Sequence, residues 1–220
     1  MAALLLDFDG VLAPLAADPA AAVLDPACAS ALRTRPVAWR LAVISGRSCD
    51  DLLPRIAAAR PDAIAGDHGV EIRLLREGRT WVHPDAVRLR PAVLAAARAL
   101  GGRVEEKRWS AKAYGAEMSA PPPGVRFLAG RGGVDVLADV DWDKGHAGAW
   151  ILDTWGAASA PAAYVGDEAT DELAFTALGP RGVRTVRVAP GETTAAAETL
   201  PDQAAVAGWL RAVLSGVAQM

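Results

Sequence analysis

Residues 2–10, AALLLDFDG, decide the fold of this 220-residue chain. They begin with a short apolar run of the kind found in strands that are buried on both faces of a parallel sheet. Asp7 and Asp9 follow two positions apart, so an extended backbone points both carboxylates to the same side. Gly10 then allows a sharp turn. Paired carboxylates at a strand end suit a nucleophile or metal ligand beside a proton donor, and an acidic turn without such a function is the alternative.

Similar apolar runs alternate with helical stretches along most of the chain, at residues 41–44, 63–65, 162–165 and 183–188. Strands that alternate with helices predict an α/β fold of three layers, in which helices cover both faces of a Rossmann-like, mainly parallel sheet. Ligands of such sheets bind outside the carboxyl ends of the strands. The polar residues that follow these runs are therefore the candidate site.

The middle of the chain breaks this alternation. Residues 84–100 show a long pattern of Ala, Leu and Arg that indicates one helix, and short strand-like runs follow it. We expect residues 79–141 to form a small α/β insert. Residues 1–78 and 142–220 then form the main domain.

Composition and charge exclude several classes of protein. The 23 Lys and Arg residues stand against 26 Asp and Glu residues with no basic run, which argues against nucleic acid as a partner. No apolar stretch reaches the ~18 residues of a membrane span, and the apolar start is too short for a signal peptide. Cys28 and Cys49 have no metal-site spacing and indicate a reduced, cytoplasmic setting. We therefore expect a small-molecule ligand, no membrane partner, and a monomer or small homo-oligomer.

Three further positions indicate phosphate chemistry. Ser45 follows the second apolar run, where its hydroxyl and a helix N-terminus favour an anion, and a simple helix cap is the alternative. Residues 166–171, GDEATD, add three acids after another run. They would make an oxygen site for Mg²⁺ if they met Asp7, and interaction with a helix dipole is the alternative. Lys144 begins a probable helix in a chain with only three lysines, which indicates a need for a compact ammonium, and a solvated lysine is the alternative.

The order of these motifs resembles the haloacid dehalogenase superfamily of aspartyl-phosphate phosphatases. Five segments together resemble, more closely, the trehalose-6-phosphate phosphatase family: LLLDFDGVLAPLAADP (4–19), LAVISGRSCDDL (41–52), AGDHGVEIR (65–73), DKGHAGAWIL (143–152) and YVGDEATDELAF (164–175). The resemblance implies a haloacid dehalogenase-type core with a small α/β cap domain inserted between the second and third motifs. Residues 79–141 occupy that place in the sequence.

The resemblance also implies the covalent chemistry. Asp7 would attack phosphorus and become a phosphoaspartate. Asp9 would protonate the leaving sugar oxygen and then activate the water that hydrolyses the intermediate. Mg²⁺ would be held by Asp7, the backbone carbonyl of Asp9 and Asp167.

Four other core residues would support that chemistry. Ser45 and Lys144 would bind the phosphoryl oxygens as charge moves in the transition state. Glu168 and Asp171 would orient either a metal-bound water or Lys144.

Substrate contacts are expected from Arg47, His68, Glu71 and Lys107. For His68 and Glu71, which would line the approach to the site, a polar turn is the alternative. For Lys107 the alternative is a surface lysine paired with Glu105.

The insert departs from the family's cap. Residues 105–107, Glu-Glu-Lys, match the family's first cap element, whereas residues 114–116, Tyr-Gly-Ala, stand where the family has His-Tyr-Arg. We expect the second cap helix to be reduced to residues 123–131, and Asp135 or Leu137 to replace a strand glutamate. Polar cap groups of this kind contact sugar hydroxyls. We therefore expect the core chemistry to be intact and substrate recognition by the cap to be altered.

The sequence therefore predicts a Mg²⁺-dependent phosphatase that acts on a phosphorylated sugar, with trehalose 6-phosphate as the first candidate. The same chemistry on another phosphorylated saccharide or pseudo-sugar is the main alternative. A non-catalytic sugar-phosphate-binding regulatory protein and a phosphotransferase or mutase are the others.

Overall fold

The computed structural model describes residues 1–130, 132–191 and 193–216. The chain divides into two compact units. One, here named the core unit, consists of Met1–Arg79 and Asp143–Met220. The other, the cap unit, consists of Thr80–Trp142.

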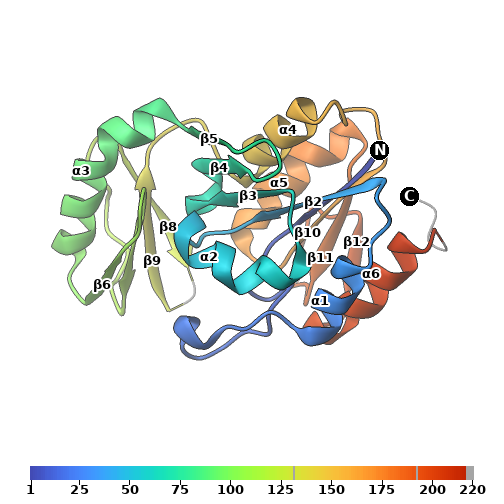
Figure 1. The fold of residues 1–220 in the computed structure, drawn as a ribbon. Coiled ribbons are helices and arrows are strands. Elements are labelled where there is room, and N and C mark those ends of the chain that lie inside the picture. Colours follow the sequence, from blue (N-terminus) through green and yellow to red (C-terminus); the bar gives the residue numbers. More distant parts are fainter. Residues whose placement is uncertain (131, 192, 217–220) are drawn as a thin grey trace. The chain divides into compact units, whose positions relative to one another are not determined.

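An eight-stranded sheet in the order β12-β11-β10-β1-β2-β3-β4-β5 organises the core unit (Figure 1). Its strands are β1 (Ala2–Leu6), β2 (Trp39–Ile44), β3 (Ala63–Gly66), β4 (Glu71–Leu74), β5 (Arg79–Val82), β10 (Ala162–Gly166), β11 (Arg184–Val188) and β12 (Glu198–Leu200). Neighbouring strands run parallel from β12 to β3, and β4 is antiparallel to β3. Strand β5 contains the boundary between the units.

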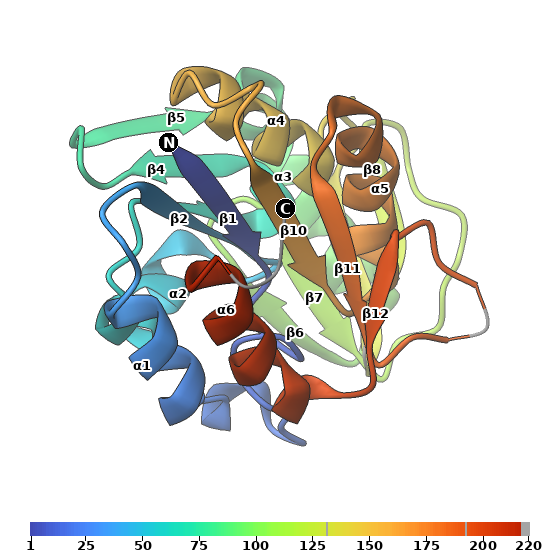
Figure 2. The same cartoon turned by 90° about the vertical axis from the view of Figure 1, so that its right-hand side faces the viewer.

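Helices lie on both faces of this sheet (Figure 2). One face is covered by α1 (Pro26–Arg33), α2 (Cys49–Ile56) and α6 (Val206–Leu214), and the other by α4 (Lys144–Thr154) and α5 (Ala169–Leu178). Side chains alternate across each strand, so Leu4 and Leu6 pack with the first group while Leu5 lies by Gly148 of α4. Burial of both faces explains the continuous apolar run of β1. The predicted α/β fold with three layers is confirmed.

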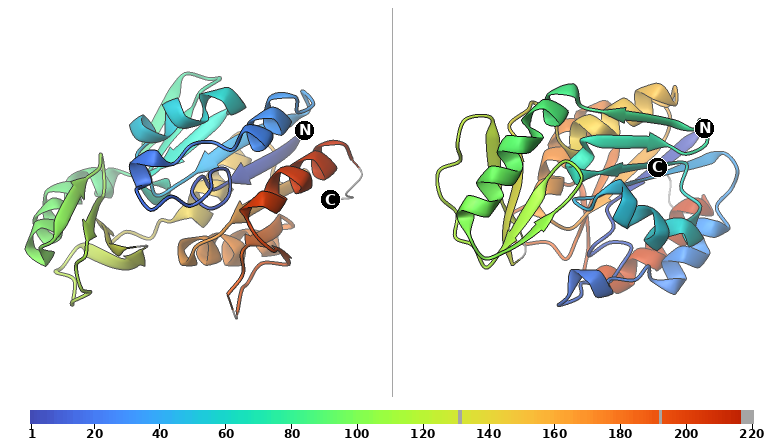
Figure 3. Two further views of the ribbon diagram at one scale, coloured as in Figure 1. Left: turned by 90° about the horizontal axis from the view of Figure 1, so that it is seen from below. Right: turned by 60° about the vertical axis from the view of Figure 1, so that its left-hand side comes forward.

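The cap unit contains one long helix and a four-stranded antiparallel sheet in the order β6-β7-β9-β8. Its elements are α3 (Pro84–Leu100), β6 (Arg103–Glu106), β7 (Ala111–Tyr114), β8 (Val125–Gly130) and β9 (Gly133–Ala138). Helix α3 packs along one face of this sheet (Figure 3). Because successive side chains of a strand point to opposite faces of the sheet, Lys112 and Asp135 lie on the opposite face from the buried Ala111 and Val136. No helix within the described ranges is both long enough and apolar enough to cross a membrane.

The prediction of a short second cap helix over residues 123–131 is wrong. Residues Val125–Gly130 are strand β8, which pairs with β9 from Val125 opposite Ala138 to Gly130 opposite Gly133. Arg131 lies outside the described residues. A six-residue segment is too short for a stable helix, whereas pairing with β9 satisfies its backbone and suits its β-branched and aromatic side chains.

Candidate active site

The parallel strands of the core unit bring three predicted residues to the same edge of the sheet. Asp7 follows β1, Ser45 follows β2 and Asp167 follows β10, and all three are buried. Carboxylate oxygens of Asp7, Asp167 and Asp171 all lie within 4.8 Å of one another. The acids of two strand ends, 160 residues apart in the chain, therefore meet in one cluster.

Lys144 joins two of these carboxylates. It is the first residue of α4, and its Nζ donates hydrogen bonds to Asp7 Oδ2 at 2.8 Å and to Asp171 Oδ1 at 2.9 Å. The residue is only 2% exposed, so it is not a solvated surface lysine. Burial opposes the charge of the ammonium, but the carboxylates of Asp171 and Asp7 outweigh burial and raise the pKa of Lys144 above its ordinary value.

Helix capping fixes where Lys144 begins its helix. Asp143 is the N-cap residue of α4, and its Oδ1 accepts from the backbone N–H groups of Gly145 at 2.7 Å and His146 at 3.0 Å. Capping by Asp143 thereby fixes the start of α4 and the backbone position of Lys144.

Asp7 lies in an environment that disfavours its charge. Burial raises the pKa of its carboxyl above the ordinary value, and Lys144 offsets only part of that effect. Its Oδ1 also accepts from the backbone N–H of Phe8 at 2.6 Å. A cation at this cluster would favour the ionised form of Asp7, which is the form that can act as a nucleophile.

Asp171 is fully buried and holds Lys144 in place. Its Oδ1 accepts from Lys144 and from the Tyr164 hydroxyl at 2.7 Å. Its Oδ2 accepts from the backbone N–H groups of Asp167 at 3.0 Å and Glu168 at 2.9 Å, at the start of α5. Because both oxygens already accept two hydrogen bonds, Asp171 acts as a support for its neighbours. Tyr164 was not predicted, although a tyrosine within an otherwise aliphatic strand is a signal that could have identified it.

The carboxylate cluster fits a hard divalent cation. Oxygen ligands from Asp7 and Asp167 are those that Mg²⁺ prefers. Gly10 has a φ of +78°, and a Cβ on it would collide with the Asp167 carboxylate. The turn after β1 can therefore approach Asp167 closely only because residue 10 is a glycine.

Ser45 is not a helix cap. The N-cap residue of α2 is Ser48, whose hydroxyl accepts from the backbone N–H of Asp51 at 3.3 Å. Ser45 is buried at the end of β2, and its hydroxyl accepts from the backbone N–H of Arg47 at 3.2 Å. Because β2 runs parallel beside β1, Ser45 ends the strand next to the one that ends at Asp7, and the helix-cap alternative is excluded.

Arg47 has partners that its place in the sequence does not indicate. Its guanidinium donates from Nε to Asp9 Oδ2 at 2.7 Å and from Nη2 to Asp9 Oδ1 at 2.8 Å. It also donates to Asp51 Oδ2 and to the Pro19 carbonyl oxygen, each at 2.7 Å. Arg47 was predicted to contact substrate, whereas in the structure it is bonded to the predicted acid/base residue.

The turn that contains His68 is strained and buried. Three consecutive residues have positive φ angles: Asp67 at +51°, His68 at +60° and Gly69 at +98°. Non-glycine residues adopt such angles rarely, and clusters of them often mark functional sites. The turn is bonded to the loop after β2, because Asp67 N donates to Arg47 O at 2.7 Å and His68 N donates to Ser45 O at 3.0 Å. It is therefore not a solvated polar turn.

Glu71 follows this turn as the first residue of β4. Its side chain is buried, and its Oε1 accepts from Arg73 Nε at 2.6 Å. The buried Glu71 carboxylate is thus paired with Arg73, whose side chain is partly exposed.

In the cap unit, two lysines approach one carboxylate. Lys112 Nζ is 3.1 Å from Asp135 Oδ2, and Lys107 Nζ is 3.8 Å from Asp135 Oδ1. Lys112 and Asp135 are direct neighbours across β7 and β9. The Lys107 side chain is only 10% exposed, which differs from an ordinary surface lysine. We refer to these three residues as the cap lysine cluster.

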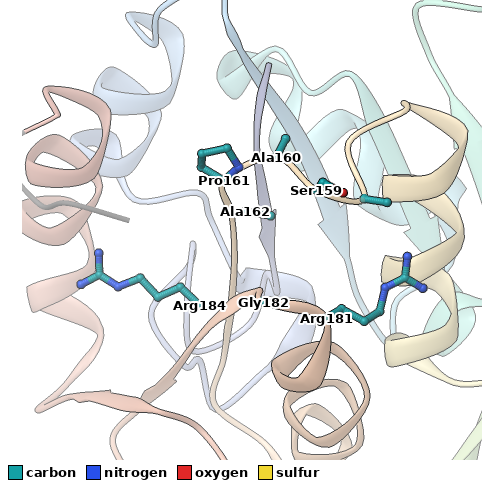
Figure 4. Close-up of a pocket in the computed structure, with 8 residues that line it drawn as sticks. Ser159, Ala160, Pro161, Ala162, Arg181, Gly182 and Arg184 are labelled. Carbon is teal, nitrogen blue, oxygen red and sulfur yellow. The ribbon is translucent and has the colours of Figure 1, made fainter.

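The core unit also has a cavity of about 270 Å³ at the start of β10, where Pro161 and Ala162 lie (Figure 4). This is the opposite end of the strand from Asp167. Arg181 and Arg184 line the cavity, but their side chains point away from one another and pair with Asp153 and Glu198. The cavity is therefore separate from the carboxylate cluster.

Comparisons with known proteins show which proteins this chain resembles. No family model matches the chain. A trehalose-phosphate phosphatase from Mycobacterium tuberculosis is 32% identical over 207 residues, which cover 82% of this chain and 52% of that protein. The chain thus spans about half the length of the curated relatives it matches.

Solved structures that share the fold include a phosphatase domain and a hydrolase. The C-terminal domain of Candida albicans trehalose-6-phosphate phosphatase superposes with a TM-score of 0.79 at 18% identity, covering 98% of this chain and 92% of that one. A haloacid dehalogenase-like hydrolase from Bacteroides thetaiotaomicron gives a TM-score of 0.72 at 15% identity, covering 96% and 98%.

The fold is therefore that of the haloacid dehalogenase-type hydrolases, with a Rossmann-like core and a small α/β cap domain inserted between the second and third motifs. Within that fold, the sequence likeness makes the chain a relative of the trehalose-phosphate phosphatases. The resemblance indicated by its motifs is confirmed.

Proposed function

We propose that the chain is a phosphatase that removes phosphate from a phosphorylated sugar, with trehalose 6-phosphate as the first candidate. The observation that supports this most is the buried Lys144 ammonium between Asp7 and Asp171, at strand ends that also present Asp167 and Ser45. Phosphoryl transfer depends mainly on positioning and on charge stabilisation, and this arrangement offers both.

In the proposed first step, an oxygen of Asp7 attacks phosphorus and the bond to the sugar oxygen breaks. Asp9 donates the proton that the leaving oxygen needs. Lys144 and Ser45 stabilise the phosphoryl oxygens, and Lys144 is held for that purpose by Asp171. The sugar leaves as an alcohol, and Asp7 becomes a phosphoaspartate.

In the second step, Asp9 accepts a proton from a water molecule that attacks the phosphoaspartate. Phosphate is released and the Asp7 carboxylate is regenerated. The same side chain thus serves first as an acid and then as a base, which requires that its carboxylate keep one well-defined position.

We propose that Asp7, Asp167 and the backbone carbonyl of Asp9 hold Mg²⁺. When bound, Mg²⁺ supplies the positive charge that lets an anionic nucleophile approach an anionic phosphate. Asp171 is left out of this set because its two oxygens are occupied by four hydrogen bonds. Glu168 and Asp171 instead support Lys144 and the loop that presents Asp167.

We assign recognition of the sugar to the cap unit, with Lys107 as the first candidate, and leave His68 and Glu71 as proposed substrate contacts of the core unit. The cap lysine cluster also favours a second candidate substrate, a phosphorylated saccharide other than trehalose 6-phosphate. Asp135, which with Leu137 is one of the two candidates for the place of the family's strand glutamate, has two lysines as neighbours. We expect the reaction to take place in the cytoplasm, where the buried thiols of Cys28 and Cys49 stay reduced.

A phosphate-release assay over a panel of substrates tests this proposal. The panel contains trehalose 6-phosphate, sucrose 6-phosphate, glucose 6-phosphate, a phosphorylated amino sugar and p-nitrophenyl phosphate, each with Mg²⁺. Preference for trehalose 6-phosphate by about 100-fold or more in kcat/KM supports the first candidate, and the same preference for another sugar supports the second. No release from any member would refute the phosphatase and leave a binding protein.

A further inference from the structure

We propose that Arg47 is a positioning residue for Asp9, and that a chain of ion pairs through Asp9, Arg47, Asp51 and Arg55 fixes the orientation of the acid/base carboxylate. This inference rests on the proposed phosphatase function. All four residues belong to the core unit.

The contact between Arg47 and Asp9 is bidentate. Nε and Nη2 of the guanidinium donate to the two different oxygens of Asp9, at 2.7 and 2.8 Å. A planar guanidinium that binds both oxygens fixes the plane of the carboxylate as well as its distance. The Asp9 side chain is 30% exposed, so without this partner it would be free to rotate into solvent.

Arg47 is itself held by the segment behind it. Nη1 donates to Asp51 Oδ2 and Nη2 to the Pro19 carbonyl oxygen, each at 2.7 Å. The guanidinium also lies 5.4 Å from the centre of the Phe8 ring and is only 10% exposed. A partly buried arginine with these partners has little freedom to move, which makes it a rigid support.

The chain of ion pairs continues to Arg55, which binds the same segment that binds Arg47. Asp51 Oδ1 accepts from Nε and Nη2 of Arg55, at 3.0 and 2.9 Å. Arg55 then donates to the carbonyl oxygens of Ala20 and Ala22, at 3.1 and 2.8 Å. Pro19, which binds Arg47, is adjacent to Ala20. Arg47, in the loop before α2, and Arg55, within α2, thus both bind the segment of residues 19–22.

This geometry gives Arg47 a role different from substrate binding. At least four of its N–H···O interactions go to protein atoms, two of them to Asp9. A general acid must lie within hydrogen-bond reach of the leaving oxygen, and a displacement of about 1 Å can cost about 100-fold in rate. Loss of Arg47 should therefore weaken the proton transfer that Asp9 performs rather than the binding of phosphate.

Leaving-group dependence separates these roles. A good leaving group departs without a proton, whereas a poor one needs the acid. If Arg47 positions Asp9, the Arg47→Met variant should lose little kcat/KM on aryl phosphates with acidic phenols and much more on those with weakly acidic phenols. If Arg47 contacts phosphate, all members of the series should lose the same factor. If it contacts the sugar, the aryl series should not change.

The experiment measures kcat/KM for a series of substituted phenyl phosphates and for the best sugar phosphate. It compares the wild type with Arg47→Met, Arg47→Lys and Arg55→Met. Asp153→Asn serves as the matched control, because it removes an ion pair with Arg181 at the far end of the sheet. Circular dichroism and thermal unfolding show whether each variant folds. If Arg47→Met does not fold, Arg47→Lys and Arg55→Met still test the inference.

The expected result for Arg47→Met is a loss of about 100-fold on the sugar phosphate and a steeper dependence on the pKa of the phenol. Arg47→Lys should recover part of the loss, and Arg55→Met should change the slope in the same direction by less. The Asp153→Asn control should match the wild type. If the wild type is active, two results would overturn this inference and leave the proposed function standing. One is an equal slope of kcat/KM against the phenol pKa in Arg47→Met and the wild type, and the other is an unchanged aryl series. An inactive wild type would overturn the proposed function and this inference with it.

Discussion

The core and cap units each contain a cluster of lysine and aspartate side chains, but the two clusters are built in opposite ways. In the core, one ammonium, Lys144, is shared by the carboxylates of Asp7 and Asp171. In the cap, one carboxylate, Asp135, is shared by Lys107 and Lys112. These are the only three lysines of the chain.

The difference indicates what each cluster can accept. The core cluster keeps an excess of carboxylates once Asp167 is included, which suits a divalent cation and then an anionic phosphate. The cap lysine cluster has the opposite balance among its own three side chains, which suits hydroxyl or anionic groups of a substrate. Core variants should therefore affect every phosphate ester, whereas cap variants should affect only substrates with a sugar. Variants of each unit test that division.

The largest effect is expected from Asp7→Asn. The substitution is nearly isosteric, so the fold should remain, but an amide cannot form the phosphoaspartate. Turnover of both a sugar phosphate and p-nitrophenyl phosphate should fall by at least about 1,000-fold. Steady-state assays with a circular dichroism spectrum check this, with Asp85→Asn on the exposed surface of the cap as the matched control. A folded Asn variant that keeps a tenth of wild-type turnover would remove Asp7 from its role.

Metal removal should have the next largest effect. In EDTA the carboxylates of Asp7 and Asp167 would face the substrate phosphate without screening, so turnover should fall by about 100-fold or more. Added Mg²⁺ should restore it, and Ca²⁺ should not, because Ca²⁺ prefers more ligands and longer distances. Asp167→Asn should raise the Mg²⁺ concentration needed for half-maximal activity. Full activity in chelator would contradict the proposed mechanism.

Much of the core site could be predicted because its residues follow short, buried strands. The apolar runs before Asp7, Ser45 and Asp167 indicate strand ends, and parallel strands bring their ends together whatever the details of packing. The clustering of Asp7, Asp167 and Asp171 could be expected on this basis, and the structure shows it. For Lys144, the rarity of lysine indicates a specific need for an ammonium and the family resemblance implies a phosphoryl contact, but neither predicts its burial.

The partners of side chains could not be predicted in the same way. Arg47 reaches Asp9 across 38 positions, and Tyr164 reaches Asp171 from the interior of a strand. Such pairs depend on the tertiary positions of loops, which local patterns do not encode. The error at β8 has a related cause, because a short run of mixed residues becomes a strand only when β9 offers it a partner.

The cap prediction is Lys107→Ala. If Lys107 reads the sugar, kcat/KM on the best sugar phosphate should fall by about 10- to 100-fold, as expected for lost polar contacts to a substrate. The value for p-nitrophenyl phosphate should change by less than about threefold, since its leaving group needs no sugar contact. Lys112→Ala is the matched variant, because it removes the other lysine beside Asp135. Equal losses on both substrates would show that Lys107 is structural.

The smallest effect is expected from the two tyrosines of the chain, which give a matched pair of Tyr→Phe variants, one in each unit. Tyr164 is fully buried and its hydroxyl donates to Asp171, whereas the hydroxyl of Tyr114 donates to Glu105 in an exposed contact of the cap. Tyr164→Phe removes one of the four hydrogen bonds that fix Asp171, so Lys144 should be held less firmly. At about 1 kcal/mol for such a bond, turnover should fall by about 3- to 10-fold.

That loss should be the same on the sugar phosphate and on p-nitrophenyl phosphate, because the role proposed for Lys144 concerns the phosphoryl group that both share. Tyr114→Phe should leave p-nitrophenyl phosphate turnover within about twofold of the wild type, since an exposed hydrogen bond contributes little. Tyr164→Phe should also lower the midpoint temperature of thermal unfolding. A loss of stability therefore does not distinguish support of Lys144 from support of the fold, and turnover must be measured as well. If Tyr164→Phe unfolds at a lower temperature yet keeps full turnover at 25 °C, the hydrogen bond supports the fold and not Lys144. A loss confined to the sugar phosphate would place Tyr164 in substrate recognition and would break the division between core and cap.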